Sequence, residues 1–595
     1  MNNNVYDFIK SEETAFKTVR VPLTDSKDWN MSEHIERCYN VANAYYHSGK
    51  NDGLRRYDDI VTPIINVAFR TEGFDVKDIV PFVNDAVKNY KSFIIKKRHP
   101  QWARKNEIDT FIDDIVESSV IYDLVVVKKS KGNKPEVVPL QSIAFCDQTD
   151  IQSGPLCLKH QYTVSQMMDF KDKWDADAID YVVTMARAEK SSSMTNTGKP
   201  VQTPGKYIEV YELHGMLPED WLKEGGNPDK YVPQLHIVAF YKGKDGERNG
   251  VTLYSGKEKS IFEGKDAVFK TLKVDRIRSQ GRACGKSIVE SLFEPQVWMN
   301  YSAQRIQKLL ASAINVFYTD SEEFGNQKLS TLPENTILKI ESGKQLGKVD
   351  GTLQNLNAFT NDQANLTSQA RIVGSASEAQ LGTNPTAGTP FALQNLVVQQ
   401  GQGIHEYRQG KIATFVADVL YRDWILNDLV ADLNSGEKFS EILTLDEMQE
   451  IVDQIATNKA EAQIKEAVLN GKLVTEADRK ALTQTYKEQF MKDGSRKFFE
   501  IIEGELDEIP MDVYVNVKGK QRYMAQNADK ITNIIRQIIS APQAFVQIPG
   551  IGKAFNQLLE ESGMSAIDFS QTTKALPAQP SQVAPPMQTE SVTTQ

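Results

Sequence analysis

One glycine-rich stretch has residue types that could bind a nucleotide. GRACGKS, Gly281 to Ser287, ends in the Gly-Lys-Ser of a phosphate-binding loop, in which backbone N–H groups surround the phosphates and the lysine reaches them. That loop needs four residues between its first glycine and the Gly-Lys pair, and this stretch has three. We therefore interpret it as a turn that leads into a helix, with Lys286 facing solvent or a channel.

A second stretch carries half of a zinc-binding motif. His405-Glu406 begins like the helical HExxH motif, whose two histidines bind zinc from one helix face, but position 409 is Gln. The other six histidines are isolated, and the four cysteines form no CxxC pair. The sequence therefore predicts no metal, no cofactor, no catalytic residue and no enzyme.

Length, charge and apolar patterning indicate how many domains the chain has and whether it binds nucleic acid or a membrane. The chain has 595 residues, too many for one core, and its net charge is −10. That charge argues against broad, tight nucleic-acid binding, but not against a channel through which DNA slides. No apolar run approaches the roughly 20 residues that span a membrane, and the first residues lack a signal pattern, so we expect production in a cytoplasm and no membrane contact.

A basic run beside an aromatic residue leaves two interpretations open. IIKKRHPQWARK, residues 94–105, places five Lys and Arg residues around Trp102, a combination that can bind single-stranded nucleic acid. A solvated helix end near a contact between subunits is the simpler interpretation. This run would end a helix over 78–105 that is broken near Pro100.

Two predicted helices must position the central part of the chain. The first, 285–314, has Pro295 near the start of its regular part, and its apolar residues recur three to five positions apart: Trp298, Tyr301, Ile306, Leu309 and Ala313. The second, 357–373, has a narrow, partly polar stripe. Neither carries enough apolar surface for a monomer's core, so we expect both to pack against neighbouring subunits.

The segments between and after these helices are of different kinds. Residues 315–356 contain extended-type runs at 316–318 and 337–340, which predict a small subdomain. Residues 374–390, GSASEAQLGTNPTAGTP, have no Lys or Arg and are typical of a functional or disordered loop. Residues 391–434 predict a long helix. Gly401, Gly403 and Gly410 would each cost it about 1 kcal/mol, which favours a kink or a close helix crossing.

The flanking regions have simpler patterns. Residues 1–284 predict a mixed α/β region, with strands at 207–214 and 234–241 and a helix over 162–183. Residues 435–570 predict a largely helical region, with a helix over 446–470, a capping box from Thr475 to Asp478 and a strand over 512–518. The Gln, Pro, Ser and Thr content of 571–595 predicts a disordered tail.

This order of parts resembles the portal protein of tailed bacteriophages. The segment GKSIVESLFEPQVWMNYSAQRIQKLL is similar to the family's approach to its first stem helix, and VYELHGMLPEDW is similar to wing segments of podophage-type portals. The resemblance rests on the order of parts and covers about two thirds of the chain. It implies an α+β, mostly helical fold with these parts: wing (1–284), stem helix 1 (285–314), clip (315–356), stem helix 2 (357–373), tunnel loop (374–390), long kinked wing helix (391–434), helical crown (435–570) and tail (571–595).

The resemblance also implies a function and partners. Portal proteins form a homododecameric ring at one capsid vertex, through which double-stranded DNA is packaged and ejected. The partners would be the terminase large subunit, head–tail adaptor proteins, and the major capsid and scaffolding proteins. The chain would then belong to the virion, after assembly in the host cytoplasm.

Site residues follow from the same resemblance. We expect tunnel-loop residues near DNA: Ser375, Ser377, Glu378, Gln380, Thr383 and Asn384. Stem residues that form basic rings in the channel, or ion pairs between subunits, would be Lys286, Arg305 and Lys308. The clip surface that contacts adaptors would include Phe317, Tyr318, Glu322 and Glu323, although the two aromatics could equally pack within the subdomain.

Two alternatives come from other classes. One is another oligomeric scaffold component of a virion, which would show no channelled ring in electron microscopy. The other is an ATP-using enzyme built around GRACGKS, which would bind ATP saturably and lose that binding on Lys286→Ala.

Overall fold

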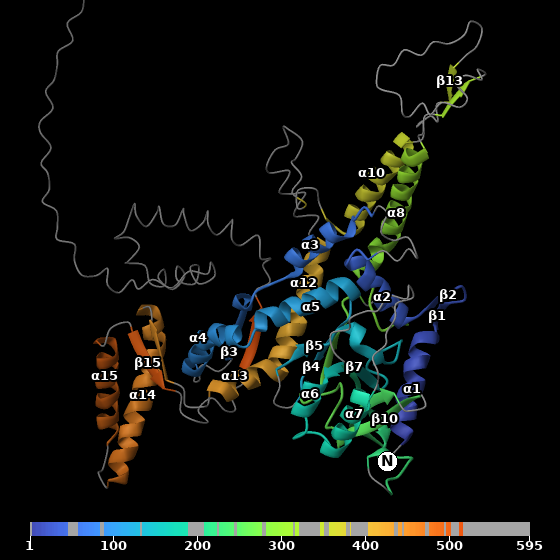
Figure 1. Ribbon diagram of the computed structural model, residues 1–595. Helices are drawn as coiled ribbons and strands as arrows, with labels where there is room; N and C mark the ends of the chain where they lie inside the picture. The colour runs from blue at the N-terminus through green and yellow to red at the C-terminus, as the bar shows by residue number, and fades with distance from the viewer. Residues whose placement is uncertain are drawn as a thin grey trace, which may run out of the picture. The chain divides into compact units, whose positions relative to one another are not determined.

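The computed structural model in Figure 1 shows a mixed α+β protein. It describes residues 3–45, 57–83, 89–130, 134–188, 207–222, 225–242, 247–275, 281–312, 316–319, 346–349, 356–376, 381, 403–433, 438–442, 445–470, 475–492, 496–500 and 511–515. The chain divides into two compact units, which are described separately. The first holds the described parts of 1–76 and 103–425, and the second those of 77–102 and 426–514.

The centre of the first unit is a five-stranded antiparallel sheet. Its order is β10-β9-β8-β7-β6, so each strand pairs with its neighbour in the chain. The strands predicted at 207–214 and 234–241 are confirmed, and both are longer than predicted. The five strands are β6 (Ile143–Phe145), β7 (Leu156–Thr163), β8 (Tyr207–Pro218), β9 (Tyr231–Lys242) and β10 (Arg248–Lys257).

Helices cover both faces of this sheet. α7 (Ala176–Ala188) packs buried apolar residues against Val210 of β8. α1 (Asn3–Thr18) contacts the other face, where Tyr211 donates a hydrogen bond of 3.0 Å to Glu13. Successive side chains of a strand point to opposite faces, so Val210 and Tyr211 mark the two sides.

A three-stranded sheet packs beside the larger one through a buried ionic contact. Its order is β11-β4-β5, from β4 (Val125–Lys128), β5 (Glu136–Val137) and β11 (Phe269–Leu272). Lys128 Nζ lies 2.6 Å from Glu212 Oε2, and the same carboxylate contacts His214, a buried residue whose other ring nitrogen lies 3.0 Å from Glu258. These bonds satisfy charges that would otherwise be expensive to bury.

Several further helices complete the first unit. Asn30 caps α2, because its side chain accepts a hydrogen bond from the backbone N–H of Glu33. The helices are α2 (Met31–Ala42), α3 (Val61–Glu72), α5 (Ile108–Tyr122), α6 (Val164–Asp169), α8 (Ile288–Ser312), α10 (Leu356–Val373) and α12 (Gly403–Phe415). A π-helical stretch, Val416–Ile425, follows α12, and the strand pairs are β1 (Val21–Thr24) with β2 (Lys27–Trp29) and β12 (Val316–Thr319) with β13 (Leu346–Val349).

The second unit contains a pair of long helices and two short strand pairs. α14 (Leu445–Leu469) confirms the helix predicted at 446–470, and the predicted capping box opens α15 (Glu476–Lys492). The strands are β3 (Ile79–Val83) with β16 (Met511–Val515), and β14 (Lys438–Ile442) with β15 (Arg496–Glu500). α4 (Asn89–Lys105) and α13 (Leu426–Leu433) complete the described part, and Trp102 of α4 donates a 2.6 Å hydrogen bond to Asp432.

Two predicted helices are wrong in their bounds. Residues 79–83 form β3, and α4 continues through Pro100 instead of breaking there. Pro100 has no N–H group, so the carbonyl of Lys96, four residues earlier, receives no helical hydrogen bond. Lys96 is exposed, so water can bond this carbonyl. The helix predicted over 162–183 starts too early, because β7 continues to Thr163, which then caps α6 with a complete capping box.

The long helix predicted over 391–434 is described only from Gly403. Of the two expectations, a kink or a close helix crossing, the second finds no support at Gly410, because a Cβ added there would meet none of the described atoms within 4 Å. The α-helical geometry is interrupted instead by the π-helical stretch Val416–Ile425. Gly401 lies outside the described residues, as do 521–540, 553–562 and the tail.

Candidate functional site at the helical pair

The two central helices pack against each other. α8 and α10 lie side by side in Figure 1, and Ser302 Oγ donates a hydrogen bond of 2.8 Å to Asp362 Oδ2 between them. α8 begins at Ile288, because Ser287 Oγ accepts a hydrogen bond from the backbone N–H of Glu290. Pro295 therefore lies inside the helix, and the prediction that it starts the regular part is wrong. The carbonyl it leaves unbonded belongs to Ser291, which is only half-buried.

The aromatic residues of α8 face solvent. Trp298 is 58% exposed and Tyr301 is 48% exposed, whereas Ile306 is buried. The single apolar stripe expected from the sequence is therefore two faces, one turned inward and one outward. The outward face is ordered: the two rings meet edge to face at 5.9 Å, and Arg305 lies over the Tyr301 ring and donates a 2.8 Å hydrogen bond to its hydroxyl.

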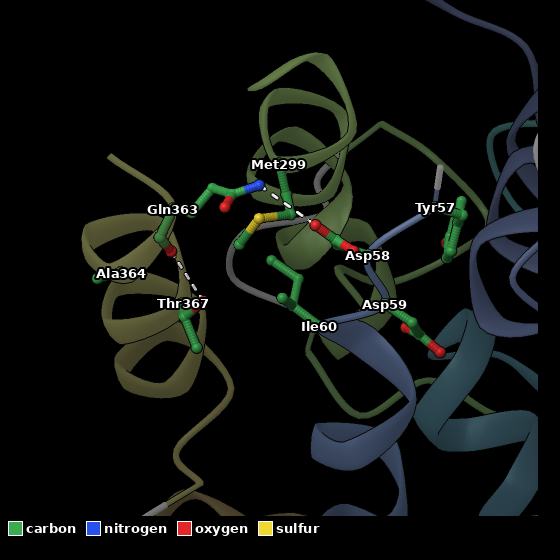
Figure 2. Close-up of a pocket in the computed structure, with 8 residues that line it drawn as sticks. All are labelled: Tyr57, Asp58, Asp59, Ile60, Met299, Gln363, Ala364 and Thr367. Atoms are coloured by element: carbon green, nitrogen blue, oxygen red, sulfur yellow. Dashed lines mark hydrogen bonds between the residues drawn. The ribbon is translucent and has the colours of Figure 1, made fainter. Parts of the chain in front are cut away.

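A shallow hollow lies between the helical pair and the segment before α3. It encloses about 400 Å³ and is lined by Tyr57 to Ile60, Met299, Gln363, Ala364 and Thr367, as Figure 2 shows. Gln296 fixes this segment to α8 by donating to the Asp58 carbonyl and accepting from the Ile60 N–H. Gln363 donates a 3.2 Å hydrogen bond to the Asp58 carboxylate from α10. The hollow thus lies where the 57–60 segment, α8 and α10 meet. Side chains of both helices, Gln296 and Gln363, are hydrogen-bonded to Asp58.

The end of α10 is a defined stop. The backbone N–H of Ser375 donates to the Ile372 carbonyl, and that of Ala376 donates to the Arg371 carbonyl. Ser375 has φ +52°, in the left-handed region. This is the Schellman arrangement, with Ser375 at the position that most often carries glycine. Ser375, the first of the residues predicted to lie near DNA, is therefore part of the helix cap.

The other predicted site residues are placed only in part. Lys286 is half-buried beside the start of α8, and Arg305 is exposed on the same helix. Phe317 and Tyr318 lie in β12, which confirms the extended run predicted at 316–318, opposite Lys348 and Gly347 of β13. For Lys308, Phe317 and Tyr318 only the backbone is described. Residues 337–340 and the remaining predicted sites lie outside the described residues: Ser377, Glu378, Gln380, Thr383, Asn384, Glu322 and Glu323.

The GRACGKS stretch has its polar groups engaged within the protein. The N–H groups of Ala283 and Gly285 donate to the carbonyls of Gln148 and Asp123. Arg282 donates hydrogen bonds of 2.9 and 2.7 Å to the two carboxylate oxygens of Glu290. Two of the backbone donors that would surround a phosphate, those of Ala283 and Gly285, are therefore committed, which favours the interpretation of this stretch as a turn into a helix.

His405 belongs to a buried ionic cluster rather than to a metal site. This cluster, formed by Glu72, Asp123, His405 and Arg408, joins α3, the end of α5 and α12. Arg408 Nε donates to both oxygens of Glu72 at 3.0 and 3.1 Å, and its Nη1 donates to Asp123 at 2.7 Å. Burial raises the pKa of Asp123 to about 6 against the opposing effects of Arg408 and a backbone N–H.

Most of this cluster was not predicted from the sequence. Glu72, Asp123 and Arg408 stand in no motif, and their partners are more than 280 residues away in the chain. One signal was present: His405, Arg408, Gln409 and Ile412 recur at helical spacing on one face, and all are buried. Polar residues that share a helix face with a core isoleucine indicate a buried polar network. They do not indicate which residues elsewhere in the chain complete that network.

Comparison with known proteins adds no assignment: no protein-family model and no curated protein sequence matches the chain. Within the described ranges, no group of three or more His, Cys, Asp or Glu side chains could hold a metal ion. None of the helices in that part of the chain is long and apolar enough to cross a bilayer.

Proposed function

We propose that this chain is a portal protein of a tailed bacteriophage. Copies would form a ring at one capsid vertex, double-stranded DNA would pass through it during packaging and ejection, and terminase and head–tail adaptor proteins would dock on it. The observation that carries the proposal is the pair α8 and α10, with a strand pair between them in the chain and ordered aromatic side chains on its outer face.

The exposed face of α8 supports assembly. Trp298 and Tyr301 would lose a large apolar area from water on contact with another copy, roughly 25 cal/mol per Å². Tryptophan, tyrosine and arginine are also the residue types most enriched at the energetic centres of interfaces. A contact between this face of one copy and a different face of the next is heterologous, and heterologous contacts close into rings when the rotation permits.

The exposed face of α10 has a different chemistry. Apart from Asp362 and, at its end, the apolar Ile372 and Val373, its exposed side chains are mostly small or uncharged, among them Asn357, Thr360, Asn361, Asn365, Ser368 and Gln369. Such a surface would let a phosphate backbone pass without binding it tightly, because tight binding needs clustered Lys and Arg. We therefore keep α10 and the segment that follows it, from Ser375 to Asn384, as the part proposed to lie nearest DNA.

Imaging and mass measurement of the purified full chain test the proposal. The wild-type protein is expected to form rings with a central channel. Replacing both aromatics, Trp298→Ala with Tyr301→Ala, is expected to give smaller species by light scattering, because the proposed contact loses its largest apolar side chains. The matched control is Tyr231→Ala, which removes a 60% exposed aromatic from the sheet and should leave rings intact. A wild-type protein that stays monomeric and folded at high concentration would rule the proposal out.

The loop after α10 gives a second test, in virus assembly. Deleting 381–389 is expected to leave ring formation intact and to impair DNA packaging or retention. Loss of the rings would show that the segment has a structural role instead.

A further inference from the structure

The strongest unexplained feature is a continuous line of buried hydrogen bonds between the two chain ends of the helical pair, the turn that enters α8 and the residue that leaves α10. Both lie at the base of this antiparallel pair, away from β12 and β13. At one end, His405 Nε2 lies 3.2 Å from the carbonyl of Gly374, the residue that follows α10. At the other, the N–H of Gly285, just before α8, donates to the Asp123 carbonyl at 3.2 Å. The buried ionic cluster connects these two points.

Each step of the line is a short, buried contact. His405 Nδ1 lies 2.9 Å from Glu72 Oε1, so the two ring nitrogens contact Glu72 and the Gly374 carbonyl. Glu72 accepts from Arg408 Nε, and Arg408 Nη1 donates to Asp123. The Glu72, Asp123 and His405 side chains are fully buried, and that of Arg408 is 6% exposed. In a low-dielectric interior such bonds polarise one another, so the loss of one weakens the next.

Packing leaves little room for the two ends to shift alone. A Cβ added at Gly374 would lie 2.2 Å from Ile64 Cγ2 of α3, and one added at Gly285 would lie 1.6 Å from Asp123 Oδ2. Arg408 also donates to the Ser119 carbonyl and hydroxyl, so its guanidinium is held on all sides. Asp123 is held through its other oxygen by the N–H of Asp275. Each charged group of the cluster is therefore held by more than one contact.

We infer that Arg408 couples the two ends of the helical pair, so that a disturbance where the chain leaves α10 changes the stability of the turn that leads into α8, and the reverse. The inference goes beyond the proposed function and holds whether or not the chain forms a ring. In a channel protein, this coupling would carry a displacement of the segment after α10 to the start of α8. Coupling between two sites is reciprocal, which makes the inference testable from either end.

Hydrogen–deuterium exchange of the full-length protein measures both ends at once. His405→Leu removes the contact with Gly374, so exchange across 371–376 is expected to accelerate about tenfold or more. The coupling predicts an acceleration of about threefold or more across 281–287 as well, although no residue there touches His405. Asp123→Asn is expected to give the reverse pattern, with its direct effect at 281–287 and its coupled effect at 371–376.

A matched control separates coupling from general loosening. His236 is also a fully buried histidine, but it contacts the neutral groups Ser255 and Gln234 in the sheet. His236→Leu should change exchange at neither end of the helical pair. An equal effect from this control would overturn the inference, and so would effects of His405→Leu and Asp123→Asn that each stay at their own end.

Substitution of Arg408 tests the connecting residue. In an Arg408→Lys background, which keeps the charge but cannot bond Glu72 and Asp123 as a planar fork, His405→Leu should no longer change exchange at 281–287. If the coupled effect persists in this background, Arg408 is not the connection and the inference fails. If Arg408→Lys does not fold, the reciprocal single substitutions above decide the matter.

Discussion

Gly285→Ala is the substitution for which the structure gives the clearest expected result. The new Cβ would lie 1.6 Å from Asp123 Oδ2 and 2.5 Å from Asp123 Cγ, so the carboxylate must move by more than 1 Å. It cannot move freely, because Arg408 and the Asp275 N–H each hold one of its oxygens. The added methyl group must therefore break the Asp123–Arg408 contact or displace the turn before α8.

The size of the effect follows from the group that is disturbed. Overpacking a core by one methyl group costs about 1–3 kcal/mol, and breaking a buried ion pair costs about 3–5 kcal/mol. We expect the free energy of unfolding to fall by an amount near the upper of these two ranges, and Tm to fall by on the order of 5–10 °C. Calorimetry of the full-length protein at neutral pH measures the fall in Tm, because the first unit of the variant should unfold at a lower temperature than that of the wild type.

One companion variant makes this result specific. Lys286→Ala changes the neighbouring residue, which is half-buried, and is expected to leave Tm nearly unchanged. If the stretch bound ATP instead, Lys286→Ala would abolish a saturable ATP interaction that the wild type shows. A Gly285→Ala protein with wild-type Tm would refute the reasoning, because the contact with Asp123 could not then be as close as the structure has it.

Three further predictions concern other parts of the molecule. Ser375 has a left-handed backbone at the end of α10, a conformation that costs glycine less than serine. Ser375→Gly is therefore expected to stabilise this end by about 0.5–1 kcal/mol and to slow hydrogen exchange there, whereas faster exchange would contradict the assigned cap. Gly410→Ala adds a side chain where no atom lies within 4 Å and should stabilise α12 by about 0.5–1 kcal/mol in chemical denaturation, whereas a loss would reveal a contact. Burial alone would lower the pKa of His214, but hydrogen bonds to Glu212 and Glu258 raise it above 6.5. Its stabilisation is therefore complete below pH 6.5 and lost as pH rises through the folded pKa, so His214→Gln should lower Tm more at pH 6 than at pH 8.5; an equal loss at both would exclude the charged ring.

The sequence allowed good prediction where a local signal determined the structure. α10 was predicted from periodicity, α14 and the strands β8 and β9 were also predicted, and the cap of α15 followed from Thr475 and Asp478. Bounds failed where a competing local signal was overlooked. Thr163 marks the end of β7 and the start of α6 at once, and Pro100 and Pro295 are accommodated inside helices. Proline signals a helix start only when no better cap lies upstream, and Ser287 is such a cap for α8.

The candidate site was less accessible to sequence reasoning. Spacing alone gave Trp298 and Ile306 the same stripe, whereas tertiary packing put them on different faces. The partner of His405, Glu72, lies 333 residues away, and no local pattern predicts a pairing over that distance. Charged residues in a core become visible only when the fold brings opposite charges together.

Because Trp298 faces outward, the intrinsic tryptophan fluorescence of the protein can show whether the outer face of α8 is covered. Of the six tryptophans in the chain, all of which lie in described segments, Trp298 alone is more than half exposed. An indole that leaves water emits at shorter wavelength, so a change at this residue would dominate the intrinsic fluorescence spectrum. Dilution of the unlabelled protein would then show, in a cuvette, the concentration at which the outer face of α8 becomes covered.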